Sequence, residues 1–153
     1  MRLVTRALAL LLLAAALLVL QSCGDSAEVQ EAKRLDTQAI RSYRAGQYVE
    51  AITLAKRSLA IKEKALGPEH PDVATSLNNL AVLYQAQGRY KDAEPLFRRS
   101  LAIREKTLGP VHPNIVIALD NLAGLFEKMG KKKEAAEFLK RAETMKKRLA
   151  EKK

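Results

Sequence analysis

The sequence repeats itself with a period of 42 residues, and this periodicity limits the folds that it can adopt. The segment SLAIKEKALGPEHP (residues 58–71) returns as SLAIREKTLGPVHP (residues 100–113), with 11 of 14 positions identical. Glycines and alanines keep the same spacing: Gly46, Gly88, Gly130; Ala51, Ala93, Ala135; Ala39, Ala81, Ala123. A constant period of roughly 20 to 50 residues is typical of stacked units that share a core and present surfaces rather than reaction centres.

Each unit contains the pattern of two helices. The first helix of the middle unit carries an apolar stripe at helical spacing: Leu77, Leu80, Ala81 and Tyr84. Gly88 is placed to end that helix, Gly109-Pro110 to end the next one, and Pro113 to open the third. We therefore predict an all-α fold, a right-handed α-solenoid of three antiparallel helix pairs over residues 30–153. The expected units are about residues 30–66, 72–108 and 114–150.

The middle unit resembles a tetratricopeptide repeat. The similarity rests on these residues: Leu80, Ala81, Tyr84, Gly88, Tyr90, Ala93, Phe97 and Leu101. The longer period and the linkers LGPEHP and LGPVHP are similar to the kinesin-light-chain variety of this repeat, which lengthens the usual unit of about 34 residues. The resemblance covers roughly residues 35–149. The first unit departs from the family pattern at Gln38 and Ser42, and the third departs at Lys132.

The resemblance implies that the first helix of each pair lines a concave side that holds a protein or peptide partner. A mixed stripe on these helices, with flanking amides, supplies the candidate groove residues: Asp36, Ile40, Tyr43, Thr75, Asn78, Asn79, Val82, Gln85, Asp120, Asn121 and Glu127. Amides can pair with the backbone of an extended peptide, and Ile40, Tyr43 and Val82 can hold an apolar side chain. The alternative for Asn79 and Asn121 is that they bond between adjacent units and bind no partner.

The carboxylate clamp of chaperone-binding relatives needs Lys and Asn at positions where this chain has other residues: Asp36, Asn78, Asp120, Ile40, Val82 and Gly124. The resemblance therefore disfavours an acidic C-terminal tail as the partner. The acids of the stripe fit a neutral or basic partner better.

The N-terminus has the pattern of a targeting segment. Arg2 and Arg6 precede the apolar residues 7–20, a run shorter than the roughly 20 residues that span a bilayer. LQSC (residues 20–23) resembles the lipobox of bacterial lipoprotein precursors, although Gln21 is bulkier than usual. This resemblance implies a signal peptide over residues 1–22, a lipid on Cys23, a short tether to residue 29, and a place in the bacterial cell envelope. A plain secretory signal and an uncleaved anchor are the alternatives. Because Cys23 is the single cysteine, no internal disulfide can form.

The net charge of +10 is concentrated at the C-terminal end. Residues 128–153 contain 11 basic and 4 acidic side chains. This end can contact anionic lipid headgroups or act as a solubilising cap of the stack, and the cap is the favoured interpretation. Nucleic acid is not an expected partner, because an exported chain does not meet it.

The residue types do not suggest catalysis. His70 and His112 stand at equivalent positions before a helix-opening proline, so we interpret them as linker residues that cap or pack the helix start. A metal site would need more ligands than this, and Glu69, the acid nearest His70, is replaced by Val111 in the next linker. Ser58 and Ser100 are expected to be small core residues. We therefore expect no enzyme activity, no metal and no cofactor.

These observations favour a membrane-anchored protein–protein interaction module, a scaffold or adaptor of the bacterial cell envelope. Three alternatives remain open: a structural solenoid that self-assembles through exposed end faces, a small-ligand-binding protein, and an accessory lipoprotein of secretion or assembly.

Overall fold

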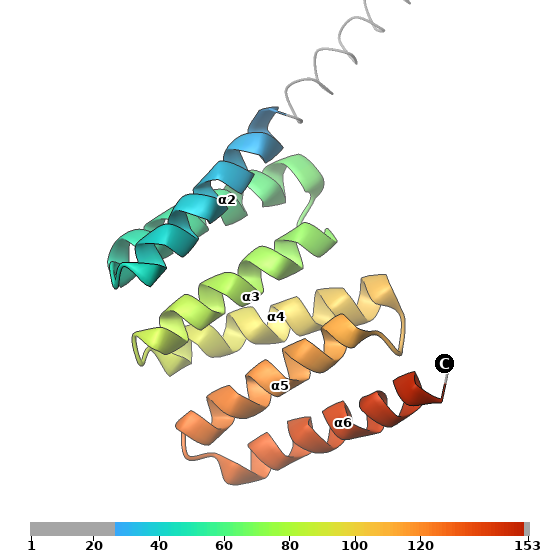
Figure 1. Cartoon of the computed structure of the whole chain (residues 1–153). Helices are drawn as coiled ribbons and strands as arrows, with labels where there is room; N and C mark the ends of the chain where they lie inside the picture. Colours follow the sequence, from blue (N-terminus) through green and yellow to red (C-terminus); the bar gives the residue numbers. More distant parts are fainter. Residues whose placement is uncertain (1–26, 152–153) are drawn as a thin grey trace, which may run out of the picture.

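The computed structural model describes residues 27–151, and within them six helices follow one another in a single row without any strand (Figure 1). The first described helix covers residues 27–44. The others are α2 (Tyr48–Leu66), α3 (Pro71–Ala86), α4 (Tyr90–Leu108), α5 (Pro113–Lys128) and α6 (Lys132–Ala150). Neighbouring helices pack in chain order, so that three antiparallel pairs stack side by side. The predicted all-α solenoid of three helix pairs is confirmed.

The helices end where the glycines predict. Gly88 follows α3 with φ of +72°, and Gly109 follows α4 with φ of +79°. Both lie in the left-handed region, which glycine adopts without the clash that a Cβ atom causes. After α3 the backbone N–H of Arg89 donates to the carbonyl of Tyr84 at 2.9 Å, which closes the last turn and satisfies a free helix-end acceptor.

The two histidines cap helices, as their positions in the linkers suggested. His70 precedes α3, and its Nδ1 accepts a hydrogen bond from the backbone N–H of Asp72 at 3.1 Å. His112 precedes α5 and accepts in the same way from Asn114, also at 3.1 Å. Each bond satisfies one of the N–H groups that have no partner in the first turn of a helix. The repeated histidine therefore has a structural explanation.

The core consists of large apolar side chains from facing helices and of small residues where helices approach closely. Phe97 and Phe126 are almost wholly buried, and so are Ala39, Ala81 and Ala123, which recur at the 42-residue spacing. Ser58 and Ser100 are also fully buried, but they do more than fill space. Their hydroxyls donate to the backbone carbonyls of Ala32 and Ala74, at 3.0 and 2.7 Å, and each bond joins the two helices of one pair.

Ion pairs at equivalent positions connect the second helices of successive pairs. Arg99 of α4 contacts Glu63 of α2 at 2.5 Å, and Arg141 of α6 contacts Glu105 of α4 at the same distance. Exposed pairs of this kind add little stability each, but they fix the position of one helix along its neighbour.

The start of the first helix differs from the prediction. Ala27, Glu28 and Val29, which we expected in the tether, are helical. Alanine and glutamate favour helix, and Glu28 forms an ion pair with Lys64 of α2 at 2.7 Å. The rest of the predicted tether, the signal peptide and Cys23 lie outside the described residues. Among those described, no helix is long and apolar enough to cross a membrane.

The N-terminal face of the stack is polar. The first helix carries polar side chains where α3 and α5 carry mostly buried apolar ones. The substituted residues are Glu31, Arg34, Gln38 and Arg41, in place of Val73, Ser76, Leu80 and Leu83 in α3 and of Ile115, Ala118, Leu122 and Leu125 in α5. No described unit covers this face, so polar residues there meet water, and the departure at Gln38 has its explanation.

The C-terminal face of the stack leaves one large apolar residue uncovered. Leu139 of α6 is 39% exposed. It occupies the position of Phe97 in the middle unit, which the following helix pair covers. No described pair follows α6, so Leu139 remains uncovered.

Candidate functional site

A small apolar pocket lies between the first described helix and α3. Its volume is about 140 Å³. Five of the eleven candidate groove residues surround it: Asp36, Ile40 and Tyr43 from the first helix, and Asn79 and Val82 from α3. Ala39, Ala55, Ser76 and Leu83 complete the wall, and these four are buried. The structure thus brings five candidates of the first two units together in one place.

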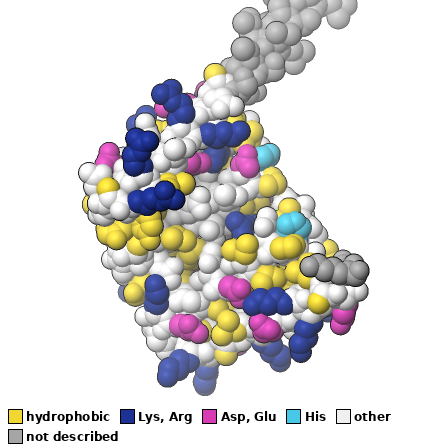
Figure 2. Space-filling view, viewed as in Figure 1, with side chains coloured by type: hydrophobic (Ala, Val, Ile, Leu, Met, Phe, Trp, Pro, Cys, Tyr) yellow, Lys and Arg dark blue, Asp and Glu magenta, His cyan; other side chains and the backbone are white. Residues whose placement is uncertain are grey.

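The apolar rim of this pocket is open to solvent. The side chains of Ile40 and Tyr43 are 49% and 38% exposed, which is unusual for large apolar residues on a helix that also faces the core. The ring of Tyr43 packs edge-on against that of Tyr48, with centroids 5.6 Å apart. Figure 2 shows hydrophobic side chains gathered at the edge where the first two helix pairs meet. A rigid, partly exposed apolar rim is suited to hold a side chain of a partner.

A buried lysine, Lys62, neutralises the carboxylate of Asp36 at the pocket wall. The Nζ of Lys62 in α2 lies 2.5 Å from the Asp36 Oδ2 and donates to the Ser76 hydroxyl at 2.8 Å. Lys62 is only 5% exposed, so its charge depends on these partners. Asp36 therefore offers no free negative charge to a basic partner at this pocket, contrary to our reasoning from the sequence.

One candidate of the third unit, Asp120, also has a lysine partner. Asp120 of α5 lies 3.5 Å from the Nζ of Lys146 in α6. Lys146 also donates to Glu143, and this hydrogen bond raises the pKa of Lys146 above its ordinary value. In both pairs, Asp36 with Lys62 and Asp120 with Lys146, the lysine lies 26 residues after the aspartate. The same position in the middle unit holds Arg104, whose pKa is lowered by burial and which donates to the carbonyl of Asn114 at 2.8 Å.

The two asparagines left open by the sequence have different environments. The side-chain amide of Asn121 in α5 donates to the Oδ1 of Asn78 in α3 at 2.8 Å, so it forms the bond between adjacent units. Asn79 lines the pocket, where its amide is exposed and can pair with a peptide backbone.

The remaining candidates lie away from the pocket. Thr75 donates its hydroxyl to the carbonyl of Pro71 within α3. Gln85 is half-buried in the last turn of α3, and Glu127 is exposed in the last turn of α5. Among the described residues, no group of three or more potential metal ligands comes together.

The comparisons with known proteins agree with this geometry. A family model of the tetratricopeptide repeat matches residues 39–106 and 77–148. The chain belongs to the tetratricopeptide repeat family. The chain is also similar to a crystal structure of nearly identical TPR-like repeats, described as those of a putative kinesin light chain of Podosopora anserina. That structure is 30% identical, with a TM-score of 0.69, and the match covers 78% of this chain and 57% of the other.

Two more distant structures share the fold of this tetratricopeptide repeat protein. The repeat domain of Arabidopsis FLU is 21% identical with a TM-score of 0.68, covering 80% of this chain and 98% of that domain. The first repeat domain of Spaghetti (RPAP3), solved with the HSP90 peptide SRMEEVD, is 18% identical with a TM-score of 0.58, covering 76% and 79%. No curated protein matches the sequence. The fold supports a protein–protein interaction module.

Proposed function

We propose that this protein is a lipid-anchored, non-enzymatic adaptor of the bacterial cell envelope that captures an extended segment of a protein partner. The proposal depends most on the pocket between the first helix and α3, where five candidate residues meet. Its volume of about 140 Å³ is close to that of a cavity that holds a benzene ring. A single apolar side chain of a peptide fits such a space, and the Asn79 amide beside it can bond to the peptide backbone.

The same volume argues against a small-molecule binding protein at this site. Sites for metabolites and drug-sized ligands usually measure roughly 300 to 1,000 Å³. The polar N-terminal face likewise argues against self-assembly by head-to-tail stacking, because such stacking would bury Glu31, Arg34 and Arg41 without apolar gain. The adaptor hypothesis therefore has more support than a small-molecule binding protein or a self-assembling stack.

Filling the pocket should weaken capture. We expect Val82→Phe to weaken the binding of selected peptides by about tenfold or more, because it displaces an apolar anchor whose burial contributes roughly 1.5–3 kcal/mol. Peptides would be selected from a random library on the full chain and their affinity measured by calorimetry. Ala60→Phe, on the exposed side of α2, is the control and should leave affinity unchanged. Selected peptides that lack a shared apolar residue, or that bind Val82→Phe normally, would show that the pocket is not the site.

The anchor is tested separately at Cys23. We expect Cys23→Ala to lose incorporation of a radioactive fatty acid by growing cells and to leave the membrane fraction, because stable attachment needs acyl chains. Cys23→Ala that incorporates as much label as the unchanged chain would refute lipidation. Peptide capture by the folded stack should be the same in both proteins.

A further inference from the structure

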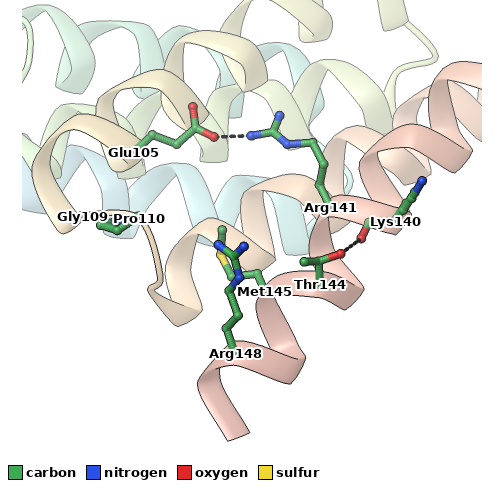
Figure 3. A pocket seen from close by; sticks show the side chains of 8 residues that line it. All are labelled: Glu105, Gly109, Pro110, Lys140, Arg141, Thr144, Met145 and Arg148. Atoms are coloured by element: carbon green, nitrogen blue, oxygen red, sulfur yellow. Dashed lines mark hydrogen bonds and ion pairs between the residues drawn. The ribbon is translucent and has the colours of Figure 1, made fainter. Parts of the chain in front are cut away.

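A second concave site, larger than the peptide pocket, is a groove between the end of α4 and the helix α6. It has a volume of about 600 Å³. Figure 3 shows the residues that line it: Glu105, Gly109, Pro110, Lys140, Arg141, Thr144, Met145 and Arg148. The Glu105–Arg141 pair lies at one side, and the Arg148 guanidinium lies beside Met145, while the side chain of Lys140 extends away from the others.

An equivalent groove exists 42 residues earlier, between the end of α2 and the helix α4. Its volume is about 400 Å³, and its lining residues are Pro68, Glu69, Arg99, Ala102, Ile103 and Lys106. Each base there has a carboxylate. Lys106 pairs with Glu69, and Arg99 pairs with Glu63 at 2.5 Å while it also donates to the Pro68 carbonyl at 3.1 Å. In this earlier groove no base is therefore without a carboxylate partner.

The later groove has lost one of these carboxylates. Val111 stands where Glu69 stands in the earlier linker, and Arg148 stands where Lys106 stands. Within the described residues, Arg148 has neither an ion pair nor a hydrogen bond from its side chain. Arg141 keeps its carboxylate, Glu105, but a guanidinium has five N–H donors and one contact leaves others free.

This combination fits a phosphate group. A guanidinium forms paired hydrogen bonds with phosphate oxygens and tolerates partial burial better than an ammonium group does. Arg148 supplies the uncompensated charge, Arg141 supplies spare donors, and Met145 and Pro110 offer apolar surface to an attached carbon chain. The volume lies in the range of small-ligand sites.

The position of the groove indicates where the phosphate comes from. The start of the first helix, the α2–α3 and α4–α5 linkers and the end of α6 lie along one edge of the stack, at the right in Figure 1. Cys23 precedes residue 27 by four residues, a span of at most about 14 Å. A lipid on Cys23 would hold the start of the first helix, at one end of this edge, near a bilayer surface. Resting on the proposed anchor, we propose that the groove between α4 and α6 binds the headgroup phosphate of an anionic phospholipid.

The test uses the full-length chain in nanodiscs of phosphatidylcholine with and without phosphatidylglycerol. Amide resonances would be followed at Gly109 and Thr144 in the later groove and at Gly67 and Ala102, their equivalents in the earlier one. We expect phosphatidylglycerol to shift the first two and not the second two. Val111→Glu restores the carboxylate that the earlier linker already carries. This substitution should weaken the binding of phosphatidylglycerol, as followed by these resonances, by about fivefold, because that is the effect of one charge near an anionic surface.

The converse substitution gives a gain of binding. Glu69→Val frees Lys106, so the same discs should now shift Gly67 and Ala102 as well. Equal shifts at both grooves in the unchanged chain, or an unaltered response in Val111→Glu, would reveal unspecific attraction and overturn the site.

Glycerol phosphate, added with phosphatidylcholine discs, distinguishes a soluble phosphate from a lipid headgroup as the ligand. A response to it without a response to phosphatidylglycerol would overturn the lipid assignment in favour of a soluble phosphate. Co-elution of the chain with phosphatidylcholine discs reports on the anchor alone, so failure of the anchor and failure of the groove are distinguishable.

Discussion

Phe97→Ala is expected to lower the free energy of unfolding by about 3–5 kcal/mol. Phe97 is only 1% exposed and stands at the centre of the stack, in the helix that links the second pair to the third. Removing its ring leaves a cavity whose walls belong to rigid helices, so little of it can close. A domain of this size has about 5–15 kcal/mol of stability in total, so the variant should be close to unfolding at body temperature. Urea unfolding followed by circular dichroism measures the effect.

The chain contains its own control for this prediction. Leu139 occupies the equivalent position in the last unit but is 39% exposed, so Leu139→Ala should cost less than about 1 kcal/mol. Similar losses in the two variants would show that another subunit or segment covers α6 in solution. An unchanged unfolding midpoint in Phe97→Ala would contradict the described packing of α4.

Lys62→Met is the second substitution with a large expected effect. The ammonium group lies 2.5 Å from Asp36 and 2.8 Å from the Ser76 hydroxyl, and the side chain is almost completely buried. Methionine keeps the length of the side chain but leaves the Asp36 carboxylate without its partner. Since the Asp36 side chain is 25% exposed, water solvates its carboxylate in part. We therefore expect the free energy of unfolding to fall by about 2 kcal/mol. The same urea experiment measures it.

Lys146→Met tests the same chemistry at the surface. Its pair with Asp120 is longer, at 3.5 Å, and both side chains are more than two-fifths exposed. Exposed pairs contribute little, so the unfolding midpoint should not change measurably. The double variant Asp36→Asn with Lys62→Met should recover part of the stability lost by Lys62→Met, because no unpaired charge then remains. If both lysine variants unfold at the same urea concentration as the unchanged chain, the buried ion pair is absent in solution.

The fold could be predicted from the sequence because each unit contains local signals that agree with one another. The 42-residue spacing, the apolar stripes, and the glycines and prolines at helix ends all specify the same helix pairs. The first boundary was harder to place. Ala27 and Glu28 follow a polar stretch without a proline, and the pairing of Glu28 with Lys64 depends on a residue 36 positions away.

The candidate site was only partly predictable. Helical spacing placed Ile40, Tyr43 and Val82 on one stripe, and the structure brings them to one pocket. Spacing along single helices could not show that Lys62 reaches Asp36 from another helix, although the 26-residue separation recurs between Asp120 and Lys146. The basic groove had a visible signal as well, the change from Glu69 to Val111, but its meaning depends on the position of Arg148 in α6.

The regularly spaced polar contacts between helices determine how the stack responds to a partner. Sliding α4 past its neighbours by a single turn, about 5.4 Å, would break its serine bond to Ala74 and both arginine–glutamate pairs together. Because these contacts would be lost together, they oppose such a shear of the stack. A polypeptide captured as we propose would give up its own freedom, while a stack held by these contacts would lose less of its own.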